Sequence, residues 1–466
     1  MKIKLMLHII LIVIFFAGFS FKSNDRNRIQ PWLENPWFWQ YKNEPVLLLG
    51  ASSDDNLFQW PAEILILHLD SMKDIGANYV RNTMSDRQDK GFELYPFFLL
   101  DNGKYDLEQL NEKYFERFEF FLRETKKRDI IVQIEIWDRF DYSRENWPSQ
   151  PYNPKNNVNY SEEESGFALE YPDHPAQNKQ PFFFSTPKQK NNEVLMKYQK
   201  MFVEKMFSIS SEFNHVLYCM DNETAAEEEW AIFWAELILT KAKEAGISVC
   251  VTEMWDNWDL KSKEHKRTFD HPERYSFCDV SQNNQKKGQE HWDNFQWVRN
   301  YISSNRRPLN TVKTYGSDGG RHGNSQDGLE RWWQHVLGGV ASARFHRPTS
   351  GFGLSELSIN SIKIARQIES VVRFWDLKPG NHLLLDREEN EAYLAFKEGE
   401  KYLLYFPGGG EIKLDLTSYD FQFQQIWMNI NTGEIQDEKT VGGGKQLHIK
   451  IQGSENWITL ISKRKD

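Results

Sequence analysis

Cysteine is scarce in this sequence, and the usual signatures of metal and nucleotide sites are missing. The 466 residues include three cysteines, an odd count, and Cys219, Cys250 and Cys278 lie in three separate apolar segments. This is no disulfide framework, and we expect each to be a small buried hydrophobic residue. The chain has no HExxH, no paired CxxC, no Walker loop and no GxGxxG after a predicted strand. We therefore expect a protein that works without a metal, a nucleotide or another cofactor.

Positive charge is also in deficit. Lys and Arg number 57 against 67 Asp and Glu, which gives a formal net charge of −10 and a pI near 5.7. No basic stripe is present that could drive counterion release from a phosphate backbone. Nucleic acid is therefore excluded as an expected partner.

A long apolar run occurs at the N-terminus. Lys2 and Lys4 precede the run from Leu5 to Phe21, and Gly18 and Ser20 offer a small-residue cleavage site. This pattern predicts a secretory signal over residues 1–23, and hence a secreted, periplasmic or cell-surface protein. The alternative is an uncleaved anchor, since the run approaches the length of a membrane span. That anchor would be the one membrane contact.

Aromatic residues are abundant. Trp 17, Tyr 18 and Phe 32 make up 14% of the chain, and many of the tryptophans lie in segments typical of loops. Trp and Tyr combine an apolar face with a polar edge, which suits stacking on sugar rings, on other flat ligands or at protein interfaces. Carbohydrate is therefore the first ligand to consider.

After a lead-in segment over residues 24–45, short aliphatic runs alternate with amphipathic stretches, which is typical of repeated βα units. Such alternation favours a (β/α)₈ TIM barrel, an α/β fold, over residues 46–373. The eight predicted strands cover residues 46–51, 78–81, 130–137, 216–220, 248–252, 275–280, 310–315 and 340–346. Helices are predicted over residues 62–75, 107–127, 193–211, 227–245, 329–337 and 356–373.

The third predicted strand is followed by a long insert. Along the strand, aliphatic positions such as Val132 and Ile134 alternate with polar ones, so that Gln133 and Glu135 are expected to point into the barrel. The insert, residues 138–192, follows a carboxyl end and is therefore expected on the catalytic face. Residues 376–466 change to short alternating runs with Gly and Pro, which predict a small antiparallel β-sandwich.

The carboxyl ends of the predicted strands carry the candidate chemistry, because barrel enzymes take their catalytic groups from these ends. Carboxylates, amides and Trp recur there, and together they could supply an acid/base pair, a ligand-orienting amide and a stacking platform for glycosidic bond cleavage. Lys313, Arg344 and His346 share an inner face and need partners; they either position Glu223 or bind an acidic sugar. The remaining strand-end candidates are Arg81, Trp137, Asn222, Glu253, Trp255, Asn283, Tyr315 and Asp318.

Two of these segments carry a family resemblance. Residues 76–81, GANYVR, look like the Gly-x-Asn-x-x-Arg of clan A glycoside hydrolases, and Asn222-Glu223 looks like their Asn-Glu pair. The chain thus resembles that clan, and more closely its apiosidase-like and cellulase-like barrels. The tail, residues 402–408, 414–416, 427–429 and 432–433, is similar to the domain named collagen-binding that follows such barrels. The resemblance implies Glu223 as general acid/base, Asn222 as a ligand of the sugar 2-hydroxyl, and Arg81 as support for the nucleophile.

The sequence departs from the clan at the second carboxylate. The clan has its nucleophilic Glu at the end of strand seven, but residues 313–316 contain no carboxylate. Asp318 and Glu253 are the two candidates. Retaining enzymes need carboxyls about 5 to 5.5 Å apart and inverting ones roughly 6.5 to 9.5 Å apart, so the stereochemistry stays open.

These observations predict an exported glycoside hydrolase that cleaves a polysaccharide or oligosaccharide. Glu223, with Glu253 or Asp318, would be catalytic. The missing strand-seven Glu motivates an alternative, a barrel that binds carbohydrate without cleaving it. A third hypothesis is a structural or adhesive surface protein that acts through its β-sandwich.

Overall fold

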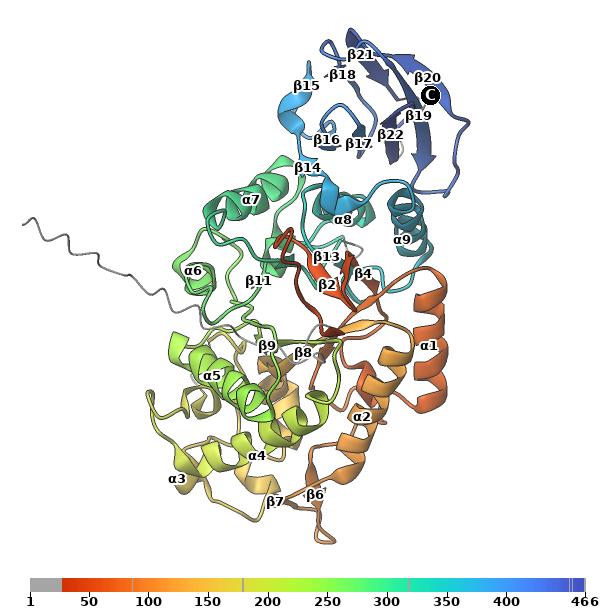
Figure 1. Ribbon diagram of the computed structural model, residues 1–466. Helices are drawn as coiled ribbons and strands as arrows, with labels where there is room; N and C mark the ends of the chain where they lie inside the picture. Colours follow the sequence, from red (N-terminus) through yellow and green to blue (C-terminus); the bar gives the residue numbers. More distant parts are fainter. Residues whose placement is uncertain are drawn as a thin grey trace, which may run out of the picture.

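The computed structural model describes residues 27–85, 87–177, 180–316, 319–451, 453–454 and 456–464. The predicted signal, residues 1–23, lies outside these ranges. Within them, no helix has both the length and the apolar character needed to span a bilayer. The described chain consists of an α/β unit followed by two antiparallel sheets (Figure 1).

Eight parallel strands form the centre of the α/β unit, and each overlaps one of the eight that the sequence predicts. They pair in three parallel ladders, in the orders β10-β9-β8-β5, β11-β12 and β13-β4. Their bounds are β4 Leu48–Ala51, β5 Tyr79–Thr83, β8 Ile131–Asp138, β9 Val216–Asn222, β10 Val251–Thr252, β11 Cys278–Asp279, β12 Leu309–Asn310 and β13 Ser342–Phe345.

Backbone hydrogen bonds connect one ladder to the next. Asn78 N donates to Leu49 O (2.8 Å), Ser276 N to Val251 O (3.1 Å), and Ala341 N to Leu309 O (2.8 Å). Each strand is therefore a neighbour of the strand that precedes it among the eight. The carboxyl ends of parallel neighbours lie at the same edge, which gathers the polar strand ends into one region.

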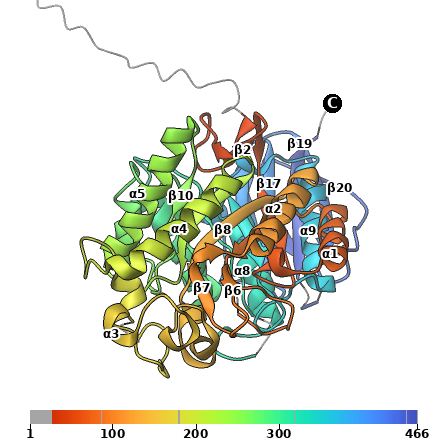
Figure 2. The same ribbon diagram turned by 90° about the horizontal axis from the view of Figure 1, so that it is seen from below.

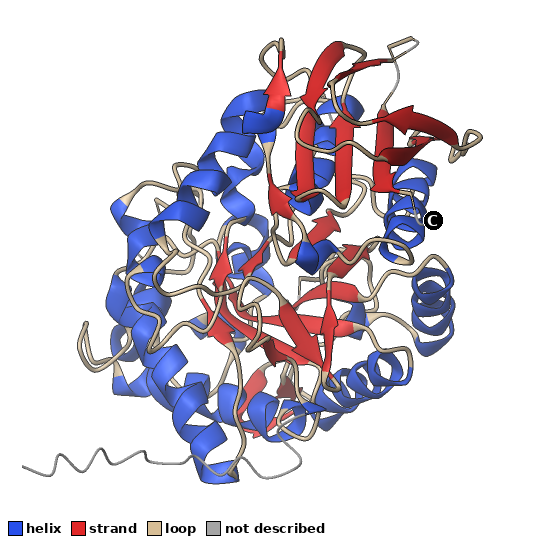
Figure 3. Cartoon of the chain, turned by 45° about the horizontal axis from the view of Figure 1, so that its top comes forward, coloured by secondary structure: helices blue, strands red, loops and turns tan. Residues whose placement is uncertain are grey.

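Helices surround these strands (Figures 2 and 3). Their bounds are α1 Ala62–Asp74, α2 Glu112–Lys127, α3 Glu162–Ser165, α4 Glu193–Ser210, α5 Glu228–Ala245, α6 Lys263–Phe269, α7 Gly288–Tyr301, α8 Ser325–Leu337 and α9 Glu356–Glu369. The sequence predicts no helix for α6 or α7, whose apolar positions are few. It also begins α2 too early, because β7 (Tyr105–Leu110) pairs with β6 (Phe97–Leu99) as a hairpin.

Strand β8 shows the predicted alternation as far as Ile136, whereas Trp137, predicted on the inner face, packs against α4 and α5. Val132, Ile134 and Ile136 are buried in the core that the strands share with the helices. Gln133 and Glu135 are fully buried on the other face, where they meet polar groups of other strands. The inner face of the strands is therefore polar toward the carboxyl ends.

The lead-in segment closes the opposite, amino ends of the strands. It forms a small antiparallel sheet of β1 (Gln30–Pro31), β2 (Trp39–Tyr41) and β3 (Glu44–Val46). Trp39 is fully buried, and its Nε1 donates to Asn310 Oδ1 at 2.8 Å. Its ring belongs to a core cluster built from the first residues of the strands: Leu48, Tyr79, Ile131 and Leu217. The two cysteines Cys219 and Cys250 lie in this same cluster, and all three cysteines are free and buried.

The insert over residues 138–192 is folded into short helices rather than a structureless loop. Its 3-10 turns are Arg139–Tyr142, Arg144–Ser149, Pro154–Asn156 and Pro181–Phe184. Many of its aromatic side chains are buried, among them Trp147, Tyr152, Phe167, Phe182 and Phe183. Part of the aromatic surplus is therefore ordinary core.

The C-terminal unit consists of two antiparallel sheets, β14-β16-β17-β22-β19-β20 and β15-β18-β21. Leu394, Leu404 and Phe406 pack between the sheets, whereas Tyr393, Leu403 and Tyr405 on alternate positions join the core of the α/β unit. Both faces of the larger sheet are thus covered, one of them by α8 (Figure 1). The strands are β14 Lys378–Pro379, β15 Leu384–Leu385, β16 Tyr393–Lys397, β17 Lys401–Phe406, β18 Glu411–Asp415, β19 Gln422–Asn429, β20 Lys439–Gly442, β21 Gln446–Lys450 and β22 Trp457–Lys463.

Candidate active site

A buried charge cluster lies at the carboxyl ends of β4, β5, β8 and β13. Arg81 is its centre: Nη1 lies 3.0 Å from Asp55 Oδ2, and Nη2 lies 2.6 Å from Glu135 Oε2. Arg344 Nη2 lies 2.8 Å from the other oxygen of Asp55. Burial alone would raise the pKa of Asp55, but Arg81, His346 and Arg344 outweigh it and hold the pKa well below its ordinary value. Asp55 is therefore a permanent anion that fixes two arginines.

This cluster decides the roles of several predicted residues. Arg344 is fully buried, and besides Asp55 it donates to Val312 O at 2.7 Å. His346 lies with its ring edge on Tyr315, centroids 4.5 Å apart, and burial lowers its pKa well below the ordinary value. Arg344 and His346 both face Asp55 and not a ligand site, so the structure does not support their binding an acidic sugar.

Glu223 follows β9 directly and adopts a left-handed backbone, with φ at 67°. Such a conformation is uncommon for a residue other than glycine and is strained, and strain of this kind persists where the surroundings enforce it. The backbone is held just after Glu223, because Thr224 N donates to Met254 O at 2.7 Å. The side chains are held by Lys313, whose Nζ contacts Glu223 Oε1 and donates to Asn222 Oδ1 at 2.7 Å. Asn222 in turn donates to Asp138 Oδ1 at 3.1 Å. One lysine thus ties the predicted Asn222-Glu223 pair to the segment that follows β12, the seventh parallel strand.

Lys313 sets the protonation of Glu223. Burial would raise the pKa of Glu223, but the adjacent ammonium more than offsets it and lowers the pKa to about 2. The lysine is itself buried, and its charge is compensated by Glu223. A carboxyl with this pKa is ionised at neutral pH and carries no proton to donate. The proton-donor role predicted for Glu223 requires its protonated form, whereas Lys313 favours the ionised one.

Glu223 opens into a pocket of about 590 Å³. Of the predicted site residues, Glu223 and Tyr315 line this pocket. The further lining residues are Phe140, Arg144, His174, Asp256, Asn257, Trp258, Gln282, Gln285, Arg321 and His322. They come from the insert, from the segments after β10 and β11, and from the segment between β12 and α8. The pocket is therefore built at the carboxyl ends of the strands.

Asp256 is the second carboxylate of this pocket. Burial raises its pKa above the ordinary value, and the negative charge of Glu223 raises it further. The two carboxyls thus have pKa values displaced in opposite directions, one ionised by Lys313 and one favouring its proton. Such a divergence is how one site holds an acid and an anion at the same pH.

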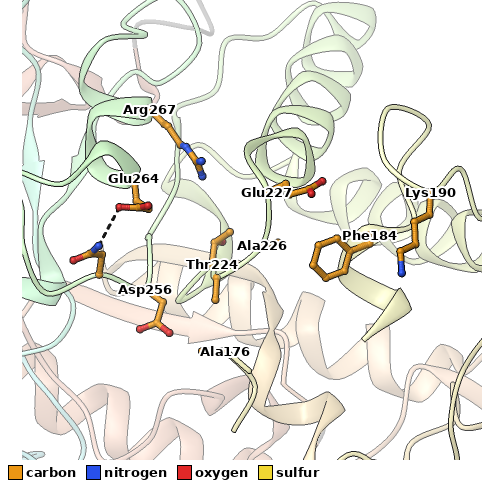
Figure 4. Close-up of a pocket in the computed structure, with 11 residues that line it drawn as sticks. Ala176, Phe184, Lys190, Thr224, Ala226, Glu227, Asp256, Glu264 and Arg267 are labelled. Atoms are coloured by element: carbon orange, nitrogen blue, oxygen red, sulfur yellow. Dashed lines mark hydrogen bonds between the residues drawn. The ribbon is translucent and has the colours of Figure 1, made fainter. Parts of the chain in front are cut away.

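Asp256 and Asn257 also line an adjoining pocket of about 660 Å³. Figure 4 shows Lys190 and Phe184 of the insert on one side of it, and Arg267 and Glu264 of α6 on the other. Asn257 donates to Glu264 Oε2 at 3.0 Å. The two pockets share a wall, and Asp256 belongs to both.

Glu253, another of the predicted carboxylates, is not part of this pocket. Glu253 is fully buried, accepting from Thr224 Oγ1 at 2.6 Å and from Met254 N at 3.0 Å. Burial and the charge of Asp221 raise its pKa well above the ordinary value, which is the state of an internal structural carboxyl. Asp318 lies outside the described residues.

The predicted stacking residues need correction. Trp137 and Trp255 are 2% and 0% exposed, because Trp137 packs on Phe182, with centroids 5.2 Å apart, and Trp255 donates to Thr268. Neither presents a face to a ligand. Trp258, three residues after Trp255, is 61% exposed and lines the Glu223 pocket.

After the sixth strand, the residue that lines the pocket is again a neighbour of the predicted one. Asn283 is turned toward α7, where it donates to His291 O at 2.8 Å and accepts from Asn294. Gln282, one residue earlier, lines the pocket instead. The 3-10 turn Ser281–Gln285 begins shortly after β11, so the strand's alternation does not continue to Asn283.

Three site residues escape the sequence reasoning: Asp55, Asp256 and Trp258. Their signal is present, because Asp55 follows the first strand and Asp256 ends the Thr252-to-Asp256 segment that follows the fifth. Each of the three stands at least four residues beyond the end of its strand, β4 or β10. Within the described ranges, no three His, Cys, Asp or Glu side chains form a group arranged to bind a metal ion.

Comparison with known proteins shows the fold class. No protein-family model and no curated protein matches the sequence. A glycoside hydrolase family 5 structure from Bacteroides vulgatus aligns with a TM-score of 0.62 at 10% identity, over 94% of this chain and 94% of its own. A further glycoside hydrolase aligns with a TM-score of 0.62 at 10% identity, over 95% and 98%. A noncanonic maltogenic α-amylase from Thermotoga neapolitana reaches 0.52 at 10%, over 90% and 99%.

These likenesses show that the chain has the fold of clan A glycoside hydrolases. The resemblance that residues 76–81 and 222–223 predict is confirmed at this level. At about 10% identity the likeness concerns the fold and not the activity. The similarity of the tail to a collagen-binding domain stays a prediction.

Proposed function

We propose that this protein is an exported glycoside hydrolase, and that its eight parallel strands close into a (β/α)₈ barrel with the active site at their carboxyl ends. The hydrogen bonds that join the three ladders support the closure. The N-terminal apolar run supports export to the periplasm, the cell surface or the medium. Trp258 supports a carbohydrate substrate, because its exposed indole offers a face on which a sugar ring can stack.

One observation carries the catalytic proposal: Glu223 and Asp256 line one pocket, and their pKa values are displaced in opposite directions. Glycosidases use two carboxyls, one protonated and one ionised, around an oxocarbenium-like transition state. Asp256, with the raised pKa, is the proton donor. Glu223, kept ionised by Lys313, is the anion.

The reaction follows from these charges. The bond between the anomeric carbon and the glycosidic oxygen breaks, and its electron pair stays on the oxygen, which takes the proton of Asp256. Positive charge develops at the anomeric carbon and is stabilised by the Glu223 carboxylate. A water molecule supplies hydroxide to that carbon, and the proton it releases returns to the carboxyl pair.

Two substitutions test this assignment. Asp256→Asn should lower kcat/KM on oligosaccharides by about a hundredfold or more, the usual size of a general-acid contribution. On nitrophenyl glycosides it should cost much less, because a nitrophenolate leaves without a proton. Glu223→Gln should lower both rates, since it removes the charge that stabilises the transition state. Release of reducing sugar from a glycan panel and of nitrophenolate from aryl glycosides measures the two effects.

Asp293→Asn, the same change at an exposed position of α7, is the matched control and should be fully active. Equal losses on both substrate types for Asp256→Asn would remove it as the proton donor. A Glu223→Gln variant with the rates of the unmodified protein would exclude the mechanism. Binding of oligosaccharides without any product would point instead to the non-catalytic barrel.

A further inference from the structure

Two arginines of the Glu223 pocket have no carboxylate partner among the described residues. Arg144, from the insert, and Arg321, from the segment before α8, both line the pocket. Both residues are exposed. Arg321 contacts the neighbouring His322, with Nε 3.3 Å from Nε2, and Arg144 makes no ion pair within the described part of the chain. Two guanidinium groups therefore border the space that a substrate would occupy.

Five other arginines of this region pair with carboxylates. Arg81 pairs with Asp55 and Glu135, and Arg139 lies 3.2 Å from Asp221. Three more follow the same rule: Arg87 with Asp138 and Asp141, Arg344 with Asp55, and Arg347 with Asp55. Carboxylates are plentiful in a chain with a net charge of −10. Arg144 and Arg321 therefore differ from these five arginines in having no carboxylate partner among the described residues.

The acidic groups of the pocket do not neutralise these arginines. The charge of Glu223 is compensated by Lys313, which leaves Asp256 as the other carboxylate of the described lining. His174 and His322 add ring nitrogens to the same lining. Arg144, Arg321 and the adjacent Lys313 outnumber the two carboxylates Glu223 and Asp256, so the charged groups at this pocket sum to a positive charge.

The backbone holds Arg144 in an unfavourable conformation. Its φ is 51°, in the left-handed region, and its amide donates to Tyr171 O at 2.7 Å. A later part of the insert thus fixes the direction in which the chain leaves Arg144. The insert does more than cover the core: it supplies one guanidinium to the pocket.

We propose that this pocket binds a glycan bearing an anionic group, a uronate carboxylate or a sulfate ester, and that Arg144 and Arg321 clamp that anion. The inference rests on the proposed function for its site and adds the substrate class. A planar guanidinium binds carboxylate or sulfate oxygens through paired N–H groups. Lys313, Arg344 and His346, the residues first considered for an acidic sugar, are engaged with carboxylates of the protein and leave this role to the two arginines.

The experiment uses the full chain and three oligosaccharide sets: oligomers of galacturonic and glucuronic acid, sulfated galactan oligosaccharides, and neutral gluco-, manno- and xylo-oligosaccharides. Cleavage is followed as kcat and KM, and binding by calorimetric titration. Arg144→Gln and Arg321→Gln are compared with Arg123→Gln, an exposed arginine of α2 paired with Glu119.

The unmodified protein should prefer one anionic set over the neutral sets. Each pocket variant should raise KM or Kd for that set by about tenfold or more, as expected for a hydrogen bond between charged groups, and should affect the neutral sets much less. The control Arg123→Gln should change neither. Added salt should weaken anionic binding alone. Whether uronate or sulfate is preferred identifies the source of the anion.

Failure of this inference is separable from failure of the proposed function. Cleavage of neutral glycans, with both arginine variants unchanged on every set, would overturn the anion clamp and leave the hydrolase in place. Binding of an anionic set that drops in both variants, without any cleavage, would support the clamp and overturn the hydrolase.

Discussion

Among the individual side chains, the position of the Lys313 ammonium determines the charge of Glu223. Lys313 stands at the strand end where the clan resemblance leads one to expect a nucleophilic Glu. The structure brings its ammonium onto Glu223 and Asn222. The lysine therefore supplies a positive charge where a second negative one was expected, and it turns Glu223 from a candidate acid into an anion. We therefore propose Asp256, the carboxyl that shares the pocket, as the acid.

Lys313→Met tests this interpretation through pH. In the intact site the pKa of Glu223 is about 2, so its ionised form persists far into acid. Without the ammonium, burial is the dominant influence, and it raises the pKa of a carboxyl above its ordinary value of about 4.3. The acid limb of the profile of kcat/KM against pH should therefore move upward by more than about one pH unit. Lys287→Met, at an exposed lysine before α7, is the control; an acid limb that stays in place would show that Lys313 does not set the charge of Glu223.

Among the secondary-structure elements, the lead-in segment is a structural part of the strand assembly. Strand β2 inserts Trp39 among the first residues of four parallel strands, and the indole nitrogen satisfies Asn310. Asn310 also donates to Tyr79 Oη at 3.1 Å, so the contact continues across the interior. A segment that the sequence presents as a polar and Trp-rich approach to the barrel therefore covers the amino end of the strands.

Trp39→Ala should lower the free energy of unfolding by about 3 to 5 kcal/mol, the usual cost of truncating a buried Trp. Urea unfolding followed by circular dichroism measures the loss. Leu33→Ala in the same segment is the control, because Leu33 is 89% exposed and its substitution should change stability by less than about 0.5 kcal/mol. Similar effects of the two changes would mean that the segment is not part of the core.

In the molecule as a whole, the C-terminal sheets and the α/β unit share one core. Tyr405 of β17 stacks on Trp333 of α8 with ring centroids 6.1 Å apart. Asn456 accepts from Tyr405 at 2.7 Å and from Gln326 of α8 at 2.9 Å. The larger sheet is therefore an integral layer against α8, which argues against an independently attached module.

Full-length protein should consequently unfold in a single cooperative transition by calorimetry, and a chain ending at residue 375 should lose that transition. Removal of the sheets exposes apolar side chains of α8 to water, and exposed patches of that kind promote aggregation. A truncated chain that stays soluble and melts at the temperature of the intact protein would show instead that the two units are independent.

Much of the fold is encoded locally in the chain. Each of the eight parallel strands overlaps a predicted one, because a β-branched or aliphatic run between amphipathic segments is a local pattern. The Asn222-Glu223 pair and Tyr315 are assigned to the strand ends for the same reason, since they stand at or just after such a run. The alternation along β8 identifies Glu135 as an inward side chain.

Long-range packing settles which of these groups meet and which face water. A strand fixes the direction of its own side chains, but once it ends, the following turn sets the direction, and that turn depends on distant packing. Trp255 is therefore buried while Trp258 is exposed, and Glu253 is internal while Asp256 reaches the pocket. The contact between Lys313 and Glu223 spans 90 residues, and no local pattern records it. The strands and the clan resemblance are thus properties of the sequence alone, whereas burial and charge pairing between distant segments determine which residues can act as acid, anion and ligand.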